Sequence, residues 1–264
     1  MTDLKRKMNR ERGKLFDLGI RNYSRLQETV RELPYIGIEL EVFARATNWK
    51  RYYGKKIDPF IGKTVLEVGA GLGEAVLHLG TNACQNWLCL EPDSKFCDTI
   101  QAKISSGELP AICSIYQGKT ESLQKEGCLF DTILYIDVLE HVEDDRSELK
   151  RAFNLLEDHG VLIILVPAHT FLFSPFDDHI GHYRRYNKKR IKQVCPVELK
   201  IERLEYLDSI GMIASMANRL LLRNRLPTLR QITLWDKIMI PISRIIDPLF
   251  FNHIGKSLLA VIRK

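Results

Sequence analysis

The sequence feature that most constrains the fold is a series of short apolar segments that alternate with helical patterns from Thr64 onward. The first five segments are nearly continuous apolar runs, which is typical of parallel strands buried on both faces. The predicted strands span residues 64–69, 87–91, 111–116, 130–136, 161–166, 199–206 and 258–263. This alternation predicts an α/β fold built on a doubly wound, mostly parallel, seven-stranded sheet.

Helices are expected between these strands and in two regions outside the alternation. The patterns favour helices at residues 74–79, 95–104 and 146–156, the second capped by Asp93 or Ser94. Residues 1–60 are expected to form a first unit with helices, and residues 61–264 the main domain. Within that domain, residues 211–251 are expected to be a helical insertion before the last strand, because no Gly-, Ser- or Pro-rich linker flanks them.

The charge of the chain is unevenly distributed. The 264 residues carry a formal net charge of +6, which is the sum of +6 over residues 1–60, −11 over residues 61–181 and +11 over residues 182–264. A hydrophobic share of 45% and a charged share of 27% exclude a disordered or fibrous chain. The basic flanks point to an anionic partner, and the acidic centre to a cationic ligand.

The cysteines and the apolar segments limit the compartment. The six cysteines form no CxxC pair and have no histidine at zinc-ligand spacing nearby, so neither a disulfide framework nor a metal site is expected. The basic N-terminus lacks the apolar stretch of a signal peptide, and the longest apolar run, residues 161–166, is far shorter than the roughly 20 residues of a membrane span. These features predict a cytoplasmic protein, either in solution or peripheral at the inner face of a membrane. A monomer and a dimer both stay open.

The strongest local signal is the glycine-rich turn after the first predicted strand. Glycines at 69, 71 and 73 would let the backbone approach a ligand at the carboxyl end of the sheet. A dinucleotide would place its pyrophosphate there, but Glu67 lies just before the turn and would repel an anion. Glu91, which ends the second strand, has the spacing of an acid that accepts hydrogen bonds from a ribose. The pattern therefore favours a cationic ligand that carries a ribose.

These residues resemble the class I S-adenosylmethionine-dependent methyltransferases. Residues 67–73 are similar to the first motif of that family, and Leu90-Glu-Pro-Asp93 to the second. Residues 131–142 resemble the fourth-strand motif of the type 11/12 group, and residues 160–167 its fifth strand. The resemblance implies a Rossmann-like methyltransferase fold with S-adenosylmethionine as cofactor. It implies that the following residues bind this cofactor: Glu67, Gly69, Ala70, Gly71, Gly73, Glu91, Pro92, Thr120 and Asp137.

The same resemblance predicts a role for the N-terminal helices. In relatives such helices cover the cofactor pocket, so residues 1–60 are expected to form an N-terminal helical lid. Tyr52 or Tyr53 would then line the pocket, although aromatic residues at this spacing also fit a hydrophobic core.

Candidate catalytic residues follow the fourth and fifth strands. Asp137, Glu140 and His141 lie after the fourth strand. A second polar cluster follows the fifth strand, and its segment Gly181-His-Tyr-Arg-Arg-Tyr186 is similar to a pattern in a subset of these methyltransferases associated with glycan, lipid or natural-product pathways. Asp177 and His182 are predicted as an acid/base or acceptor-orienting pair, with His141 as a further catalytic candidate. Substrate binding is predicted for Arg184, Arg185 and Tyr186, since a guanidinium suits a carboxylate or phosphate. The alternative is an internal network of salt bridges that only shapes the loop.

The insertion at residues 211–251 combines large apolar groups with arginines and lysines. This composition is typical of helices that lie on an anionic membrane surface. It also fits a helical cap that packs on the fold and covers the acceptor site. Three prolines, Pro227, Pro241 and Pro248, are expected to divide the segment into short helices.

The sequence therefore predicts a methyltransferase that acts on a small-molecule, sugar or lipid-linked acceptor, which the basic flank suggests is anionic. The alternatives are an RNA methyltransferase, an NAD(P)-dependent oxidoreductase on a similar fold, and a scaffold without activity. No nucleic-acid partner is expected, because the chain carries no stacking-platform motif for RNA. Glu67 and the Glu-Pro-Asp motif argue against the oxidoreductase.

Overall fold

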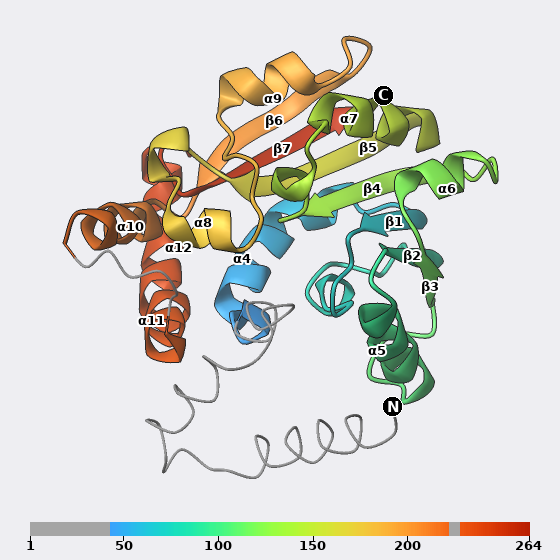
Figure 1. Ribbon diagram of the computed structural model, residues 1–264, viewed down its shortest axis with the longest axis horizontal. Helices are drawn as coiled ribbons and strands as arrows, with labels where there is room; N and C mark the ends of the chain where they lie inside the picture. The colour runs from blue at the N-terminus through green and yellow to red at the C-terminus, as the bar shows by residue number, and fades with distance from the viewer. Residues whose placement is uncertain (1–42, 222–227) are drawn as a thin grey trace. The chain divides into compact units, whose positions relative to one another are not determined.

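A seven-stranded sheet forms the centre of the fold (Figure 1). The computed structural model describes residues 43–221 and 228–264, with side chains described except at 218–221. The strand order is β3-β2-β1-β4-β5-β7-β6, and every adjacent pair is parallel except those of β7, which is antiparallel to β5 and β6. The strands are β1 Thr64–Val68, β2 Asn86–Glu91, β3 Cys113–Gln117, β4 Phe130–Ile136, β5 Leu156–Pro167, β6 Lys200–Leu207 and β7 Ser257–Arg263. The predicted doubly wound fold is confirmed.

The order of the strands fixes where a ligand can bind. From β1 the chain proceeds outward to β2 and β3, and then returns to β4 on the other side of β1. Open α/β sheets bind ligands at such a reversal point, beyond the carboxyl ends of the strands. The site is therefore expected above the carboxyl ends of β1 and β4.

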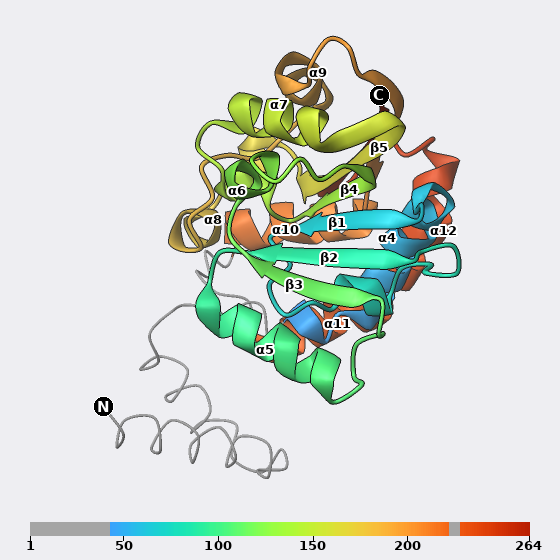
Figure 2. The ribbon, with the colours of Figure 1, turned by 90° about the vertical axis from the view of Figure 1, so that its right-hand side faces the viewer.

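Helices cover both faces of the sheet (Figures 1 and 2). The helices are α4 Thr47–Ile57, α5 Ser94–Ser105, α6 Thr120–Gln124, α7 Asp145–Leu155, α8 Pro175–His179, α9 Lys188–Val194, α10 Ser209–Leu221, α11 Leu229–Leu234 and α12 Ile240–Leu249. Side chains of α4, α5, α11 and α12 pack on one face of the sheet, and those of α6, α7 and α9 on the other. The alternation along β1 follows from this arrangement, since Val65 faces the first core and Leu66 and Val68 face the second.

Three local predictions need correction or adjustment. Residues 74–79 do not form the expected α-helix; only a single 3₁₀ turn is present, Ala75–Leu77. Six residues between two glycines are too few to offset the cost of helix nucleation, and the segment instead buries Val76 and Leu79 in the core. The third strand begins at Cys113 rather than 111, and the fifth begins at Leu156 rather than 161. Asp93 caps α5 as predicted, because its side chain accepts a hydrogen bond from the backbone N–H of Lys95.

The insertion is helical, as expected, but Pro241 does not divide it. A π-helical turn, Trp235–Met239, joins α11 directly to α12, so the helical path is continuous from Leu229 to Leu249. Pro241 lies in the first turn of α12, directly after this π-helical turn, and Pro248 lies in its last turn. Pro227 lies outside the described residues. Among the helices that are described, none is long and apolar enough to cross a membrane.

Buried aspartates attach the insertion to the rest of the fold. Asp236 accepts hydrogen bonds from the backbone N–H groups of Asn48 and Trp49 at the start of α4. Asp247 accepts one from the Tyr52 hydroxyl at 2.8 Å and two from the backbone N–H groups of Asp208 and Ser209. Because these carboxylates are desolvated, their hydrogen bonds hold α4, α10 and α12 in fixed relative positions.

The part of the predicted lid that the structure describes is α4, which is helical as expected. Tyr52 and Tyr53 are both buried in the core on the face of the sheet that α4 covers. The rest of the predicted lid, residues 1–42, lies outside the described residues.

Candidate active site

The glycine-rich turn leaves β1 in a conformation that glycine favours. Gly69, Gly71 and Gly73 have φ values of 65°, 57° and 69°, in the left-handed region. A Cβ on Gly69 would also meet the Val138 side chain at 2.8 Å. The turn is held down by the N–H groups of Gly69 and Ala70, which both donate to the carbonyl of Leu90 at the end of β2. The loop is thus a preformed cradle at the reversal point of the sheet.

Glu91 lies across this cradle at the end of β2. One of its carboxylate oxygens accepts a hydrogen bond from the Gly71 N–H at 2.8 Å, and the other from the Asp93 N–H at 3.0 Å. A carboxylate oxygen can accept a second hydrogen bond, so Glu91 keeps acceptor capacity toward a ligand. Pro92 is exposed beside it. Glu91 therefore lies directly beside the glycine turn.

Glu67 lies beneath the turn rather than at its surface. It faces the first core, where its carboxylate accepts a hydrogen bond from the Trp87 indole N–H at 2.8 Å. Burial raises the pKa of Glu67 to about 7, and the bond from Trp87 opposes part of that rise. Its negative charge is therefore available to a cationic ligand above the turn only when the pH is near or above 7.

Two other predicted cofactor residues differ in their placement. Asp137 follows β4 with a φ of 53° and is exposed to solvent. Partial desolvation of its carboxylate raises its pKa, and the neighbouring His182 opposes part of this rise. The Thr120 hydroxyl instead points into the second core, where it lies 3.0 and 3.1 Å from the two carboxylate oxygens of Glu148. Any contact of Thr120 with a ligand would therefore involve its backbone.

Asp177 and His182 form the predicted pair. The Asp177 carboxylate is fully buried on α8 and lies 2.9 Å from Nδ1 of His182. The same carboxylate accepts two hydrogen bonds from the Arg185 guanidinium, at 2.8 and 3.0 Å, and bonds from the N–H and hydroxyl of Ser174. Burial opposes ionisation of Asp177, but the bonds from His182 and Arg185 outweigh it and hold the pKa below its ordinary value. The Asp177 carboxylate is thus held in its charged form and orients the ring of His182.

The Nε2 atom of His182 faces Glu140 and His141, which belong to the 3₁₀ turn after β4, Leu139–His141. Nε2 lies 3.8 Å from Oε1 of Glu140, and the rings of His182 and His141 are 4.6 Å apart in an edge-on arrangement. Glu140 is fully buried, and neither of its carboxylate oxygens has a hydrogen-bond partner within the described part of the chain. Burial and the nearby Asp137 raise the pKa of Glu140 well above its ordinary value.

His141 differs from His182 in its surroundings. Its ring is exposed on one side, and burial of the other side together with the neighbouring His182 lowers its pKa to about 4. His141 is therefore neutral at physiological pH. The structure brings three predicted catalytic residues, Asp177, His182 and His141, into one cluster after β4 and β5.

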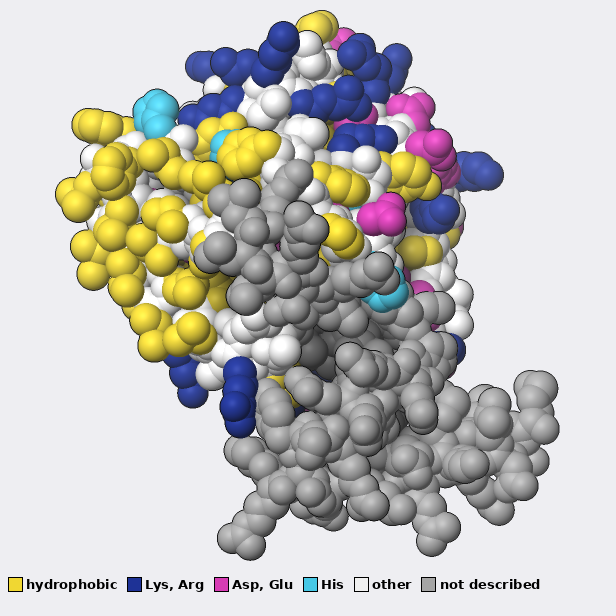
Figure 3. Space-filling view, turned by 60° about the vertical axis from the view of Figure 1, so that its left-hand side comes forward, with side chains coloured by type: hydrophobic (Ala, Val, Ile, Leu, Met, Phe, Trp, Pro, Cys, Tyr) yellow, Lys and Arg dark blue, Asp and Glu magenta, His cyan; other side chains and the backbone are white. Residues whose placement is uncertain are grey.

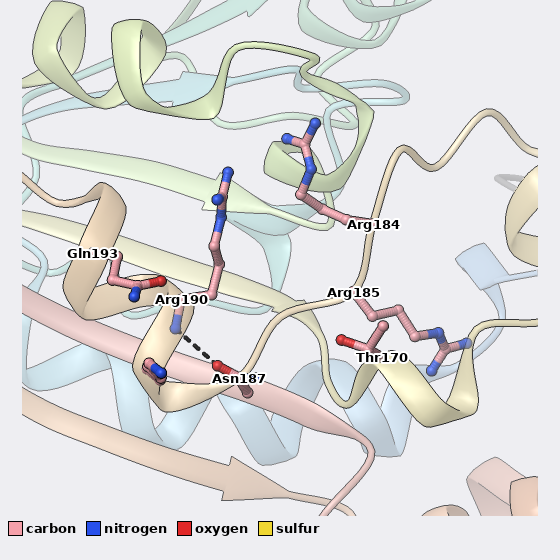
Figure 4. A pocket seen from close by; sticks show the side chains of 7 residues that line it. Thr170, Arg184, Arg185, Asn187, Arg190 and Gln193 are labelled. Atoms are coloured by element: carbon pink, nitrogen blue, oxygen red, sulfur yellow. Dashed lines mark hydrogen bonds between the residues drawn. The ribbon is translucent and has the colours of Figure 1, made fainter.

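The neighbouring residues Arg184 and Arg185 contact different partners. Figure 4 shows Arg185 pointing away from Arg184 and Arg190. Arg184 donates to the carbonyls of Val142 and Glu143 and lies 3.3 Å from the buried Asp145. A shallow pocket between these arginines is lined by Thr170, Arg184, Arg185, Asn187, Lys189, Arg190 and Gln193.

Tyr186 does not reach the cluster around His182. Its side chain is fully buried, and its hydroxyl lies 3.1 Å from the carbonyl oxygen of Leu139 and 3.0 Å from the Asp145 carboxylate. Among the predicted substrate residues, Arg185 is thus the one that contacts the cluster, because its guanidinium donates a hydrogen bond to Asp177.

Lys256 is a site residue that sequence reasoning missed. Its ammonium group lies 4.0 Å above the Trp235 ring and 3.8 Å from the Asp208 carboxylate. Burial lowers its pKa, and its charge acts on Asp137. Because β7 runs antiparallel, the residue that precedes it lies at the same edge as the carboxyl ends of β4 and β5. A Gly-Lys pair just before a predicted antiparallel last strand is the signal that would have found it.

The comparisons with known proteins agree with this geometry. A family model described as a methyltransferase domain matches residues 41–220, which is more than half of the chain. The fold and the site define an α/β enzyme of the class I S-adenosylmethionine-dependent methyltransferase type. The chain belongs to this methyltransferase family.

Individual relatives are distant. The chain is 26% identical over 120 residues to a ubiquinone biosynthesis O-methyltransferase of Azorhizobium caulinodans, a match that covers 43% of this chain and 45% of that protein. The match thus spans less than half of that curated relative. A solved S-adenosylmethionine-dependent methyltransferase from Archaeoglobus fulgidus is 14% identical, covers 88% of this chain and all of its own, and has a TM-score of 0.55. Coclaurine N-methyltransferase bound to N-methylheliamine and S-adenosylhomocysteine is 13% identical, covers 83% of this chain and 72% of its own, and has a TM-score of 0.54.

Proposed function

We propose that the protein transfers a methyl group from S-adenosylmethionine to a hydroxyl group of an anionic small-molecule, sugar or lipid-linked acceptor. The observation that carries this proposal is the division of the site into two sides. Acidic residues, Glu67, Glu91 and Asp137, surround the glycine turn. Basic residues, His182, Arg185 and Lys256, lie toward the ends of β5 and β7, beside the buried carboxylates of Asp177 and Asp208. The acidic side suits the sulfonium and ammonium of the cofactor, and the net charge of +11 over residues 182–264 is the reason for proposing an anionic acceptor.

Each side would contribute to the reaction in a different way. Bound S-adenosylmethionine supplies a methyl group on a positively charged sulfur. Glu91 would accept hydrogen bonds from its ribose, and the Gly69 turn would let it approach the backbone. The Asp177 carboxylate keeps the proton of His182 on Nδ1, so Nε2 is left with a lone pair that can take the proton of an acceptor hydroxyl. The O-methyltransferase named above supports a hydroxyl acceptor.

Calorimetry and a methyl-transfer assay test this function together. We expect S-adenosylmethionine and S-adenosylhomocysteine to bind and NAD(P)H not to bind. Glu91→Ala should weaken cofactor binding at least about 10-fold, because it removes both the ribose acceptor and a support of the Gly71 turn. His182→Ala should retain cofactor affinity while radiolabelled methyl transfer to hydroxy acids, sugar acids and lipid extracts falls by about 10²–10⁴-fold. Loss of cofactor binding in His182→Ala would show that the loop belongs to the cofactor side instead.

The insertion favours a lipid-linked acceptor. Its outer side, which we call the apolar face, consists of exposed hydrophobic residues, and Figure 3 shows hydrophobic side chains gathered over one side of the molecule. The members of the apolar face are Ile213, Met216, Leu234, Ile238, Ile242, Ile245, Leu249, Phe250, Phe251 and Ile254. Arg230, Lys237 and Arg244 are exposed beside them. The two acids between residues 229 and 254, Asp236 and Asp247, are both buried and bonded inward. The outer side of this segment therefore presents cations and apolar groups, which suits the interface of an anionic membrane.

Vesicle flotation tests the membrane proposal. We expect the protein to float with vesicles that contain an anionic phospholipid at low salt, and less with neutral vesicles. The double variant Ile245→Glu and Leu249→Glu should lose most of this binding, since it places two carboxylates on residues that are 71% and 72% exposed. Val197→Glu is the matched control, because Val197 is also exposed but lies outside the apolar face. Equal flotation of the double variant and the control would refute the proposal.

A further inference from the structure

We infer that Glu140, His141 and His182 form a binding site for a divalent transition-metal ion. One carboxylate oxygen of Glu140 and one ring nitrogen of each histidine all lie within 4.8 Å of one another. Two imidazoles and a carboxylate are a donor set that suits Zn²⁺, Mn²⁺, Fe²⁺ or Co²⁺. The sequence did not indicate this site, because two of the ligands are adjacent and the third lies more than forty residues further along the chain.

Glu140 supplies the independent observation. Glu140 is fully buried, and the described residues offer its carboxyl group no hydrogen bond; such a group is unfavourable, because it has lost its contacts with water without a replacement. One of its oxygens, Oε1, lies 3.8 Å from Nε2 of His182. That separation is too long for a hydrogen bond. It is close to the roughly 3.3–3.5 Å between two ligands that each lie about 2.0–2.2 Å from one tetrahedral metal ion.

The surroundings of His182 fit a metal ligand in a second respect. Histidines that bind metals usually donate their other ring N–H to a carboxylate, which fixes the tautomer and orients the ring. Asp177 occupies that position at 2.9 Å from Nδ1, and Arg185 and Ser174 hold the Asp177 carboxylate in turn. With the proton of His182 on Nδ1, the lone pair of Nε2 would point toward Glu140.

The position of His141 leaves a route for the ion and for a further ligand. His141 is exposed, so one side of the cluster is open to solvent. Three protein ligands with an open position are the arrangement of catalytic rather than structural metal sites. Metal binding itself does not depend on the proposed function. If that function holds, Nε2 of His182 would bind the ion instead of acting as the base, and the ion would help an acceptor oxygen at the open position to lose its proton to solvent, because it stabilises the oxygen anion.

Metal titration of the full-length chain, with any affinity tag removed, tests the inference without an activity assay. We expect the wild-type protein to bind one equivalent of Co²⁺ with visible absorption bands of a low-symmetry site, and Zn²⁺ to displace it. Glu140→Gln, His141→Ala and His182→Ala should each weaken binding by at least about 100-fold, since even an outer-shell partner contributes about 10–100-fold. His159→Asn is the matched control, because His159 is an exposed histidine with a φ of 65° that asparagine tolerates.

Glu140→Gln separates loss of the metal site from loss of the fold. It removes a buried, unpartnered acid and preserves its shape, so the thermal unfolding midpoint of the metal-free variant should equal or exceed that of the wild type. Loss of Co²⁺ binding in Glu140→Gln, at an unfolding midpoint no lower than that of the wild type, supports the site. The inference is overturned if the wild-type protein does not bind one equivalent of Co²⁺, or if Glu140→Gln and His182→Ala bind Co²⁺ with the same affinity and spectrum as His159→Asn.

Discussion

Replacing Asp177 by alanine is expected to lower the free energy of unfolding by about 3–5 kcal/mol. The Asp177 carboxylate has no exposed surface and is the common acceptor for Ser174, His182 and Arg185. Its removal leaves the Arg185 guanidinium, which is largely buried, without its counter-ion. Because breaking one side of a buried ion pair leaves an uncompensated charge, this loss is larger than the net contribution of the pair.

Urea unfolding measures the effect, and Asp178→Ala is the matched control. Asp178 is the next residue on the same helix and is exposed, so its replacement should change stability by less than about 0.5 kcal/mol. We also expect the difference between Asp177→Ala and the wild type to depend on pH. A group whose pKa is lowered by folding stabilises the protein above its unfolded value of about 3.8, and this contribution is lost as the pH falls toward the folded pKa. Equal unfolding midpoints for the two variants at pH 7 would show that the Asp177 network does not hold the loop.

The same network explains why the sequence left two interpretations of this loop open. Asp177 and His182 were predicted as a pair, and the alternative was a set of internal salt bridges. The structure contains both, because Arg185 neutralises the carboxylate that orients His182. Arg184 and Arg185 are adjacent in the sequence but serve Asp145 and Asp177 respectively. No local pattern distinguishes these partners, since each aspartate is brought to its arginine by the packing of α7 and α8.

The sheet was predictable for a different reason. Strands buried on both faces require continuous apolar runs, and each of the seven leaves that signature or an alternating one in the sequence. Glu91 and the glycines were predictable as well, because their spacing is set by a turn that begins at the end of β1. The orientation of Glu67 was not, since it depends on Trp87 of the neighbouring strand. Lys256 depends likewise on the antiparallel direction of β7.

The structure explains part of the uneven charge of the chain. Residues 182–264 have a net charge of +11 and include six acidic residues. Three of these six, Asp208, Asp236 and Asp247, are buried and fasten the insertion to α4 and α10. The outer surface of this part is therefore more basic than the sequence count suggests. The basic character belongs to the surface that would meet an acceptor or a membrane, and the acids serve the interior.

Glu67→Gln is expected to stabilise the protein above pH 7 and to weaken cofactor binding. Glu67 has a pKa of about 7 in the folded chain, against about 4.5 when unfolded. Folding therefore favours the protonated form, so stability is unaffected below pH 4.5 and falls progressively between pH 4.5 and 7. Glutamine keeps an oxygen for the Trp87 N–H but never ionises. We expect a gain of about 1–3 kcal/mol at pH 8 and little change at pH 4.5.

The expected loss of cofactor binding also follows from the charge of the Glu67 carboxylate. If the ionised Glu67 carboxylate attracts the cationic cofactor, its removal should weaken S-adenosylmethionine binding by about 10-fold at pH 8, or ~1.4 kcal/mol. Urea unfolding and calorimetry at pH 5 and pH 8 measure both effects. Glu74→Gln is a control of opposite sign: burial opposes the ionisation of Glu74, but Lys50 and Lys103 lower its pKa, so this variant should be destabilised at pH 8 and less so in acid. A Glu67→Gln variant that is less stable than the wild type at pH 8 would mean that the carboxylate contributes more to the native core than its desolvation costs. If Glu67→Gln and the wild type bind S-adenosylmethionine equally well, Glu67 does not contribute to cofactor binding. Glu91 and Asp137 would then be the acids that favour a cation there.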